Sequence, residues 1–153
     1  MINKNVSNKG DIEMNFDNSC FYCVKDNRLD ELMIKICDLE VSTAFLFKEQ
    51  TYRGRCLVAY KEHVSEICDL SEAERNAFMN DVAKVAKAMH LAFNPTKVNY
   101  GAYGDTMAHL HFHLIPKYED GPDFGGVFRM NPREVYLSDE EYSKLVAKVK
   151  ENL

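Results

Sequence analysis

Three of the five histidines alternate with apolar residues in one short segment, residues 108–116. Because successive side chains of a β-strand point to opposite faces, His109, His111 and His113 are expected on one face of a sheet. The residues between them are expected on the other face: Leu110, Phe112 and Leu114. An imidazole can serve as a nucleophile, an acid, a base or a metal ligand. Neighbouring rings on such a face lie roughly 7 Å apart, so the pattern indicates a reactive centre.

A second group with potential chemistry is the pair Cys20 and Cys23. Two thiolates at this spacing can bind one metal ion or form a redox-active dithiol, and both residues can equally be buried cysteines. The pair alone does not choose among these three roles. The remaining cysteines lie among apolar residues, and we interpret them as small buried hydrophobic residues: Cys37, Cys56 and Cys68.

Short strands and helices must position these residues. Ser71 and Glu74 form a capping box that predicts the start of a long helix, and Ser138 with Glu141 predicts the start of a final helix. Apolar residues at helical spacing predict a short amphipathic helix over residues 29–37. Strands are predicted at the histidine segment and at three further places: residues 43–48, 55–60 and 98–103.

Length and composition set the outer bounds. A chain of 153 residues, 46% of them apolar, predicts one domain over residues 16–153 after a polar, flexible tail over residues 1–15. The net charge of -5 argues against binding to a nucleic acid polymer or an anionic membrane. We find no signal-peptide pattern and no membrane-spanning run, and the cysteine number is odd, so a reduced, cytoplasmic protein is expected.

The histidine segment carries a family resemblance. His109-Leu110-His111-Phe112-His113-Leu114-Ile115 resembles the signature of the histidine triad (HIT) superfamily of nucleotide hydrolases and transferases. The resemblance covers roughly residues 18–117, with the cysteine pair, hairpin, Lys-x-His, long helix, strand and triad in the same order. It implies an α+β fold of the HIT type, in which helices pack on an antiparallel sheet of about five strands, and usually a homodimer.

The resemblance also implies a reaction. Members of the superfamily attack the α-phosphorus of a nucleoside 5′-phosphate derivative through the middle histidine, here His111, and water then resolves the nucleotidyl-histidine. The substrate classes it suggests are dinucleoside polyphosphates, nucleoside phosphoramidates and adenylated conjugates. His113 matches the residue that helps to place phosphate oxygens and the leaving group. Thr106 matches a residue that hydrogen-bonds a phosphate oxygen, and Asn99 matches the asparagine of the preceding strand.

A metal site follows from the same resemblance. Many triad proteins bind zinc through a Cys-x-x-Cys pair, a histidine after the hairpin and the first triad histidine. The matching residues here are Cys20, Cys23, His63 and His109. Four protein ligands leave no open position, so the zinc is expected to be structural and to fix the strand that aims the nucleophile.

Two positions depart from the superfamily pattern. Asp105 stands where glutamine is common, and its carboxylate would repel a polyphosphate, which affects the choice of leaving group. Phe47 stands where an acidic residue often binds the ribose, so that contact is missing or comes from a neighbour such as Glu49. Phe45, Leu46 and Phe47 are candidates for the wall of an apolar base pocket.

Two other functions are compatible with these residues. A non-catalytic nucleotide-binding sensor, in which Asp105 has blocked turnover, would bind nucleotide without forming a covalent intermediate. A zinc-stabilised adaptor module would need metal in order to fold but would not bind nucleotide.

Overall fold

The computed structural model describes residues 15–153. The tail expected over residues 1–15 therefore lies outside the described residues, except for Asn15. The described chain contains the following elements: α1 (Phe21–Val24), α2 (Asn27–Leu32), β1 (Met33–Asp38), β2 (Ser42–Phe47), β3 (Cys56–Tyr60), a 3-10 turn (Ile67–Asp69), α3 (Glu72–Phe93), β4 (Lys97–Ala102), β5 (His111–Lys117) and α4 (Asp139–Lys150).

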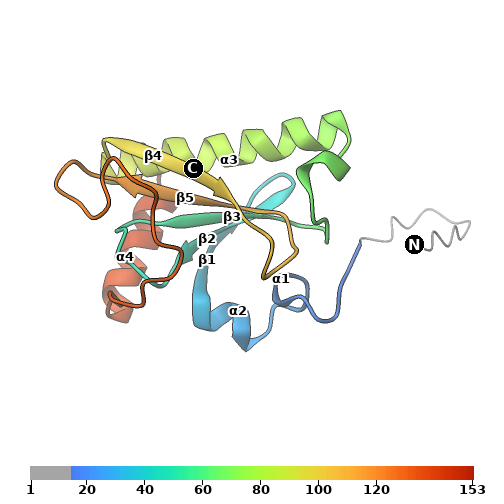
Figure 1. The fold of residues 1–153 in the computed structure, drawn as a ribbon, viewed down its shortest axis with the longest axis horizontal. Coiled ribbons are helices and arrows are strands. Elements are labelled where there is room, and N and C mark those ends of the chain that lie inside the picture. The colour runs from blue at the N-terminus through green and yellow to red at the C-terminus, as the bar shows by residue number, and fades with distance from the viewer. Residues whose placement is uncertain (1–14) are drawn as a thin grey trace, which may run out of the picture.

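The five strands form one antiparallel sheet in the order β1-β2-β3-β5-β4. The hairpin predicted from residues 43–48 and 55–60 is the β2–β3 pair, and β5 lies between β3 and β4. Helix α3 runs along one side of the sheet, whereas α1 and α2 lie on the other side (Figure 1). The expected α+β architecture with an antiparallel five-stranded sheet is confirmed.

Helices α3 and α4 cover one face of the sheet. Leu46 of β2 and Leu114 of β5 pack there with Val82 of α3 and Leu145 of α4 in the main hydrophobic core. Each helix begins with the capping box predicted from the sequence. In α3, for example, the Glu74 amide donates to Ser71 Oγ while the Ser71 amide donates to Glu74 Oε2.

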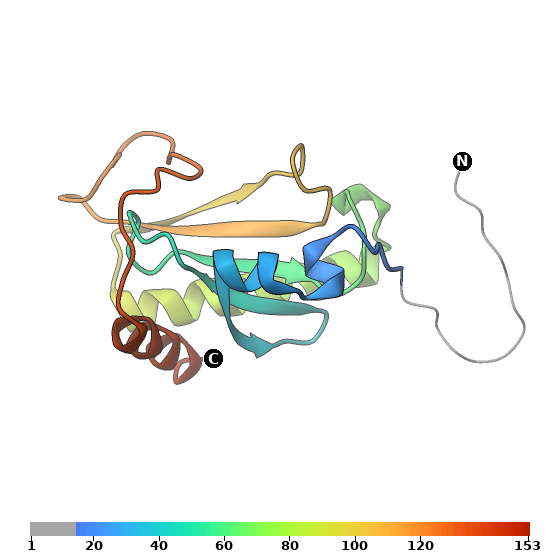
Figure 2. The same ribbon diagram turned by 90° about the horizontal axis from the view of Figure 1, so that it is seen from below.

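The opposite face carries the histidines. Residues that face each other across an antiparallel pair share a face, and here His111 lies opposite Ala59 and His113 opposite Leu57. A smaller apolar cluster covers part of this face and connects α1 and α2 with the strands: Cys20, Tyr22, Leu29, Met33, Phe45, Phe47, Leu57 and Ala59. Figure 2 shows α1 and α2 in front of the sheet on this side.

The helix predicted over residues 29–37 is wrong in its second half. Helix α2 ends at Leu32, and residues 33–38 form the edge strand β1. The register of β1 against β2 shifts between Lys35 and Cys37, which marks a β-bulge. The bulge interrupts strict alternation, so the buried residues Met33 and Ile36 are three apart, which is also the spacing of a helix.

None of the helices within residues 15–153 is long and apolar enough to cross a membrane.

Candidate active site and metal centre

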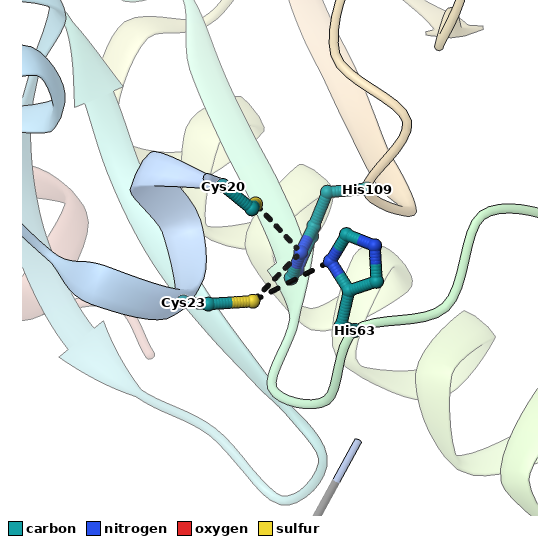
Figure 3. Close-up of side chains that lie close together, drawn as sticks. All are labelled: Cys20, Cys23, His63 and His109. Carbon is teal, nitrogen blue, oxygen red and sulfur yellow. Dashed lines mark hydrogen bonds between the residues drawn. The ribbon is translucent and has the colours of Figure 1, made fainter. Parts of the chain in front are cut away.

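Four side chains from three separate segments meet at the end of the sheet. Cys20 and Cys23 come from the start of α1, His63 follows β3, and His109 precedes β5 (Figure 3). Their potential ligand atoms all lie within 4.8 Å of one another. His109 Nδ1 is 3.4 Å from Cys20 Sγ and 3.8 Å from Cys23 Sγ, and His63 Nδ1 is 3.4 Å from Cys23 Sγ. The structure thus brings together the four residues predicted as metal ligands.

This group fits a tetrahedral zinc ion. With Zn–S and Zn–N bonds of ordinary length, tetrahedral geometry places a sulfur and a nitrogen about 3.6 Å apart. The three sulfur–nitrogen distances, from 3.4 to 3.8 Å, bracket that separation. Two thiolates and two imidazoles are also a common donor set of structural zinc sites.

The outer nitrogens of both histidines in this group have partners. His109 Nε2 donates to the Tyr60 carbonyl over 2.8 Å, so a neutral His109 presents the lone pair of Nδ1 to the cysteines. His63 Nε2 lies 3.6 Å from an Asp17 carboxylate oxygen, and Asp17 in turn accepts hydrogen bonds from Ser19. Burial lowers the pKa of His109 to about 4, which keeps the ring neutral. Such outer partners orient the ring of a ligating histidine.

His111 has the opposite tautomer. Its Nδ1 lies 2.5 Å from the His109 carbonyl oxygen, which can only accept a hydrogen bond. Nδ1 must therefore carry the proton, and in the neutral ring the lone pair is on Nε2. Burial lowers the pKa of His111, which favours this neutral form. The ring thus has one nitrogen free for attack on an electrophile.

His113 is hydrogen-bonded to an arginine. Its Nδ1 lies 2.9 Å from a terminal nitrogen of Arg55, and a guanidinium can only donate. Nδ1 is therefore the acceptor, and the proton of the neutral ring is on Nε2. Burial and the Arg55 charge lower the pKa of His113 to about 2. Burial also lowers the pKa of Arg55 to about 10, so Arg55 remains charged at neutral pH.

Aromatic rings surround the two reactive histidines. Tyr22, which lies between the paired cysteines in sequence, stacks on His109 with a centroid distance of 4.8 Å and contacts His111 at 5.3 Å. Phe128 and Tyr103 lie 6.2 and 6.1 Å from the His113 ring. The sequence patterns did not indicate a role in the site for four of these residues: Arg55, Tyr22, Tyr103 and Phe128. The available indication was an arginine at the start of a predicted apolar strand, because arginine is rarely fully buried without a specific partner.

The segment between β5 and α4 (residues 118–137) brings Phe128 to the site, and buried polar side chains hold it there. Glu49 accepts hydrogen bonds from the backbone amides of Glu134 and Val135. The Tyr52 hydroxyl donates to Asp123 and accepts from the Arg129 amide. Oε1 of Glu49 is thus committed to the backbone of this segment and the side chain is buried, which argues against the prediction that Glu49 supplies the missing ribose contact.

The predicted substrate-binding residues lie near the triad but differ in position. Asn99 is on β4, two residues from Gly101, which faces His113 across the sheet. Asp105 and Thr106 are exposed in the loop between β4 and β5. Beside that loop is a cavity of about 150 Å³ whose walls come from the start of the histidine segment, the end of β4 with the loop that follows it, and the loop after β3: Ser65, Glu66, Ile67, Ala102, Tyr103, Gly104, His109, Leu110 and His111.

The predicted wall of the base pocket and the predicted burial of three cysteines are confirmed only in part. Phe45 and Phe47 lie in the cluster on the histidine face, but Leu46 is in the main core on the other side and cannot line the same pocket. Cys56 is buried as expected. Cys37 is only half-buried, and the interpretation of Cys68 as buried is wrong because its side chain is exposed.

The chain is similar to known proteins in both its fold and its sequence. The structure resembles that of a histidine triad protein from Sinorhizobium meliloti (TM-score 0.77, 23% identity, 84% of this chain and 95% of that one). It also resembles a zinc-bound histidine triad family protein from Mycobacterium smegmatis (TM-score 0.61, 24% identity, 87% and 94%). The HIT domain model matches residues 32–120, more than half of the chain. The chain belongs to the HIT family.

A curated relative adds an activity to this comparison. Adenosine 5′-monophosphoramidase of Schizosaccharomyces pombe is 30% identical over 132 residues, which cover 84% of this chain and 98% of that protein. The HIT family thus includes a hydrolase that is similar to this chain over nearly its whole length.

Replacing Glu49 with alanine should loosen residues 118–137, because the amides of Glu134 and Val135 lose a buried acceptor. We expect faster amide hydrogen exchange at these two residues and a free energy of unfolding lower by about 1–3 kcal/mol. Glu119→Ala, at an exposed position of the same segment, is the control and should change neither quantity. Equal exchange rates in the Glu49 variant and the wild type would contradict this role.

Proposed function

We propose that this protein is a nucleotide hydrolase or nucleotidyl transferase that acts on the α-phosphorus of a nucleoside 5′-phosphate derivative, with nucleoside phosphoramidates as the preferred class. The observation that carries the proposal is the hydrogen bond from His111 Nδ1 to the His109 carbonyl, which leaves Nε2 as a lone pair on a neutral ring. The phosphoramidase activity of the fission yeast relative supports the choice of substrate.

In the first step, Nε2 of His111 attacks the α-phosphorus and the bond from phosphorus to the leaving group breaks. The leaving amine of a phosphoramidate takes up a proton from solvent, and the nucleotide remains attached to the imidazole. An imidazole suits this role because it is nucleophilic when neutral and is a good leaving group once phosphorylated. The reaction is thereby divided into two displacements of lower barrier.

In the second step, water attacks the same phosphorus and the bond to Nε2 breaks. The nucleoside monophosphate leaves, one water proton passes to solvent, and neutral His111 is restored. In the transferase reaction, another acceptor takes the place of water and receives the nucleotidyl group. His113, with its proton on Nε2, would donate a hydrogen bond to a phosphate or leaving-group oxygen or nitrogen as negative charge develops.

The cavity beside the β4–β5 loop is a suitable place for the phosphate. Its volume of about 150 Å³ is too small for a whole nucleotide. Its wall includes His111 and Gly104, and Gly104 is followed in the chain by Asp105 and Thr106. We propose that Thr106 donates a hydrogen bond to a phosphate oxygen and that Asn99, on β4, also contacts the substrate. Phe45, with Tyr22, would contact the base.

Asp105 affects the choice among the substrate classes. Its carboxylate lies in the loop that borders the cavity, so a leaving group with several phosphates would meet a like charge. A neutral amine leaving group meets no such repulsion. Asp105 therefore favours phosphoramidates over dinucleoside polyphosphates.

Replacing His111 with alanine tests the nucleophile. Because Nε2 is the only group proposed to bond to phosphorus, turnover of adenosine 5′-phosphoramidate should fall by about 10⁴-fold or more, as for other covalent nucleophiles. His90→Ala, in which an exposed histidine of α3 is removed, is the matched control. Turnover retained in a folded His111→Ala variant would reject the proposal. Tight nucleotide binding without turnover by the wild type would favour the sensor.

We propose that zinc binds the Cys20, Cys23, His63 and His109 group and is structural. The donor set and its distances fit the ion, and a similar fold from Mycobacterium smegmatis is described as zinc-bound. All four ligands come from the protein, so the ion would supply rigidity and not an activated water. It would attach α1, and with it Tyr22, to the start of the histidine strand.

Elemental analysis of the purified protein should find about one zinc ion per chain. Cys23→Ser should abolish this stoichiometry and lower the melting temperature, because the shell loses a thiolate. Cys68→Ser, an exposed cysteine outside the group, should leave both unchanged. Wild-type protein without zinc, whose melting temperature does not change on chelation, would contradict the metal site.

We also propose that the protein is a homodimer, as is usual in the superfamily. Strand β4 is an edge of the sheet and has backbone groups available for pairing, and its Tyr100 side chain is exposed. Light scattering should give twice the chain mass of 17.6 kDa. Tyr100→Glu should lower the measured mass, whereas Tyr136→Glu, at another exposed tyrosine, should not. A wild-type mass of one chain would contradict the dimer.

A further inference from the structure

Arg55 is a fully buried cation whose side chain forms no salt bridge within residues 15–153. One terminal nitrogen donates to the Met130 carbonyl over 2.7 Å, and the other donates to His113 Nδ1 over 2.9 Å. The guanidinium carbon lies 4.2 Å from the centre of the Phe47 ring and 5.1 Å from that of Phe128. Burial of a charge in such surroundings is costly, so its position requires a reason.

The chemistry of the guanidinium determines the proton on His113. Arginine has five N–H donors and no acceptor, and it is not deprotonated under ordinary conditions. A neutral imidazole that accepts at Nδ1 must hold its proton at Nε2. Arg55 also occupies the site at which a second proton would be added, so the imidazolium form cannot keep this hydrogen bond.

We propose that Arg55 is a positioning residue that fixes His113 as the neutral tautomer with its proton on Nε2, so that His113 donates a hydrogen bond to the substrate but does not transfer this proton as a general acid. The inference rests on the proposed function, because it assigns the role of His113 in that reaction. The same guanidinium attaches residues 118–137 to the triad through the Met130 carbonyl.

The groups around His113 are consistent with this assignment. His111 lies beside it on β5 with the ring centres 5.0 Å apart, and Tyr103 approaches from the β4–β5 loop. The ring of Tyr103 fills the space above Gly101, the residue opposite His113 on β4. Phe47 and Phe128 cover the remaining sides and carry no charge.

Two opposing influences act on the charge of Arg55. Burial lowers its pKa, whereas the negative charge of Glu49 raises it. None of the carboxylates hydrogen-bonds to His113 among the described residues, so nothing there stabilises an imidazolium. The low pKa of His113, caused first by burial and then by Arg55, agrees with a ring that stays neutral at physiological pH.

The tautomer can be measured without any substrate. Long-range ¹H–¹⁵N correlation spectra of the ¹⁵N-labelled full-length protein distinguish a protonated ring nitrogen from one that is a lone pair. We expect His113 with a bare Nδ1 and a protonated Nε2, unchanged between pH 5 and pH 8. A proton on Nδ1 of His113 in the wild type, or titration of the ring in this range, would overturn the inference, whatever the variants do.

Variants of Arg55 test the cause. In Arg55→Met the donor is lost, so His113 should populate both tautomers and take up a proton at higher pH than in the wild type. Arg55→Lys retains a charged donor and should restore the Nε2–H form at least in part. Arg53→Met, at an exposed arginine two residues earlier, is the matched control. A folded Arg55→Met protein with the wild-type tautomer and titration would overturn the inference.

Kinetics connect the tautomer to the reaction. Loss of the partner that orients a metal-ligating histidine costs about 10- to 100-fold in metal affinity or activity, and by analogy we expect a decrease of this size in kcat for Arg55→Met, with partial rescue in Arg55→Lys. An unchanged kcat in Arg55→Met would overturn the positioning role. Wild-type protein that shows the expected ring spectra but turns over no nucleotide substrate would contradict the proposed function and still support the tautomer assignment.

Discussion

Hydrogen bonds fix the tautomer of each triad histidine. One nitrogen of each imidazole is hydrogen-bonded to a group that can only accept or can only donate. The Tyr60 carbonyl accepts from His109, the His109 carbonyl accepts from His111, and Arg55 donates to His113. In the neutral rings, the free lone pairs are therefore on His109 Nδ1 and His111 Nε2, and the outward proton is on His113 Nε2. Three identical side chains thus acquire three different chemical properties.

The fold supplies these partners from distant parts of the chain. Antiparallel pairing with β3 places His111 and His113 on the face away from α3, where the rings are shielded but not enclosed by the main core. The cysteine pair and α1 hold His109, which begins the histidine segment. Residues 118–137 return across the β2–β3 connection and place Phe128 and Met130 against Arg55. The site is therefore built by packing on one face of a sheet whose other face forms the core.

The sequence predicted features that local patterns determine. Alternation identified the histidine face, and capping boxes identified the starts of α3 and α4. The cysteine pair did not reveal its own partners; the family resemblance pointed to His63 and His109, which the structure brings together with it. The bulge in β1 was not predictable, because Met33 and Ile36 have the spacing of a helix. The partners of Arg55 were not predictable either, because His113 and Met130 are 58 and 75 residues away from it in the sequence.

In the proposed reaction, Nε2 of His111 forms a bond to phosphorus. The most direct measurement is to mix the protein with adenosine 5′-phosphoramidate, quench within the first turnovers under alkaline conditions that preserve phosphorus–nitrogen bonds, and locate the added mass by peptide mass spectrometry. We expect adenylate on the peptide that contains His111, absent after brief acid treatment and absent in a His111→Ala variant. Release of adenylate by the wild type without any such adduct, or an adduct on another residue, would contradict it.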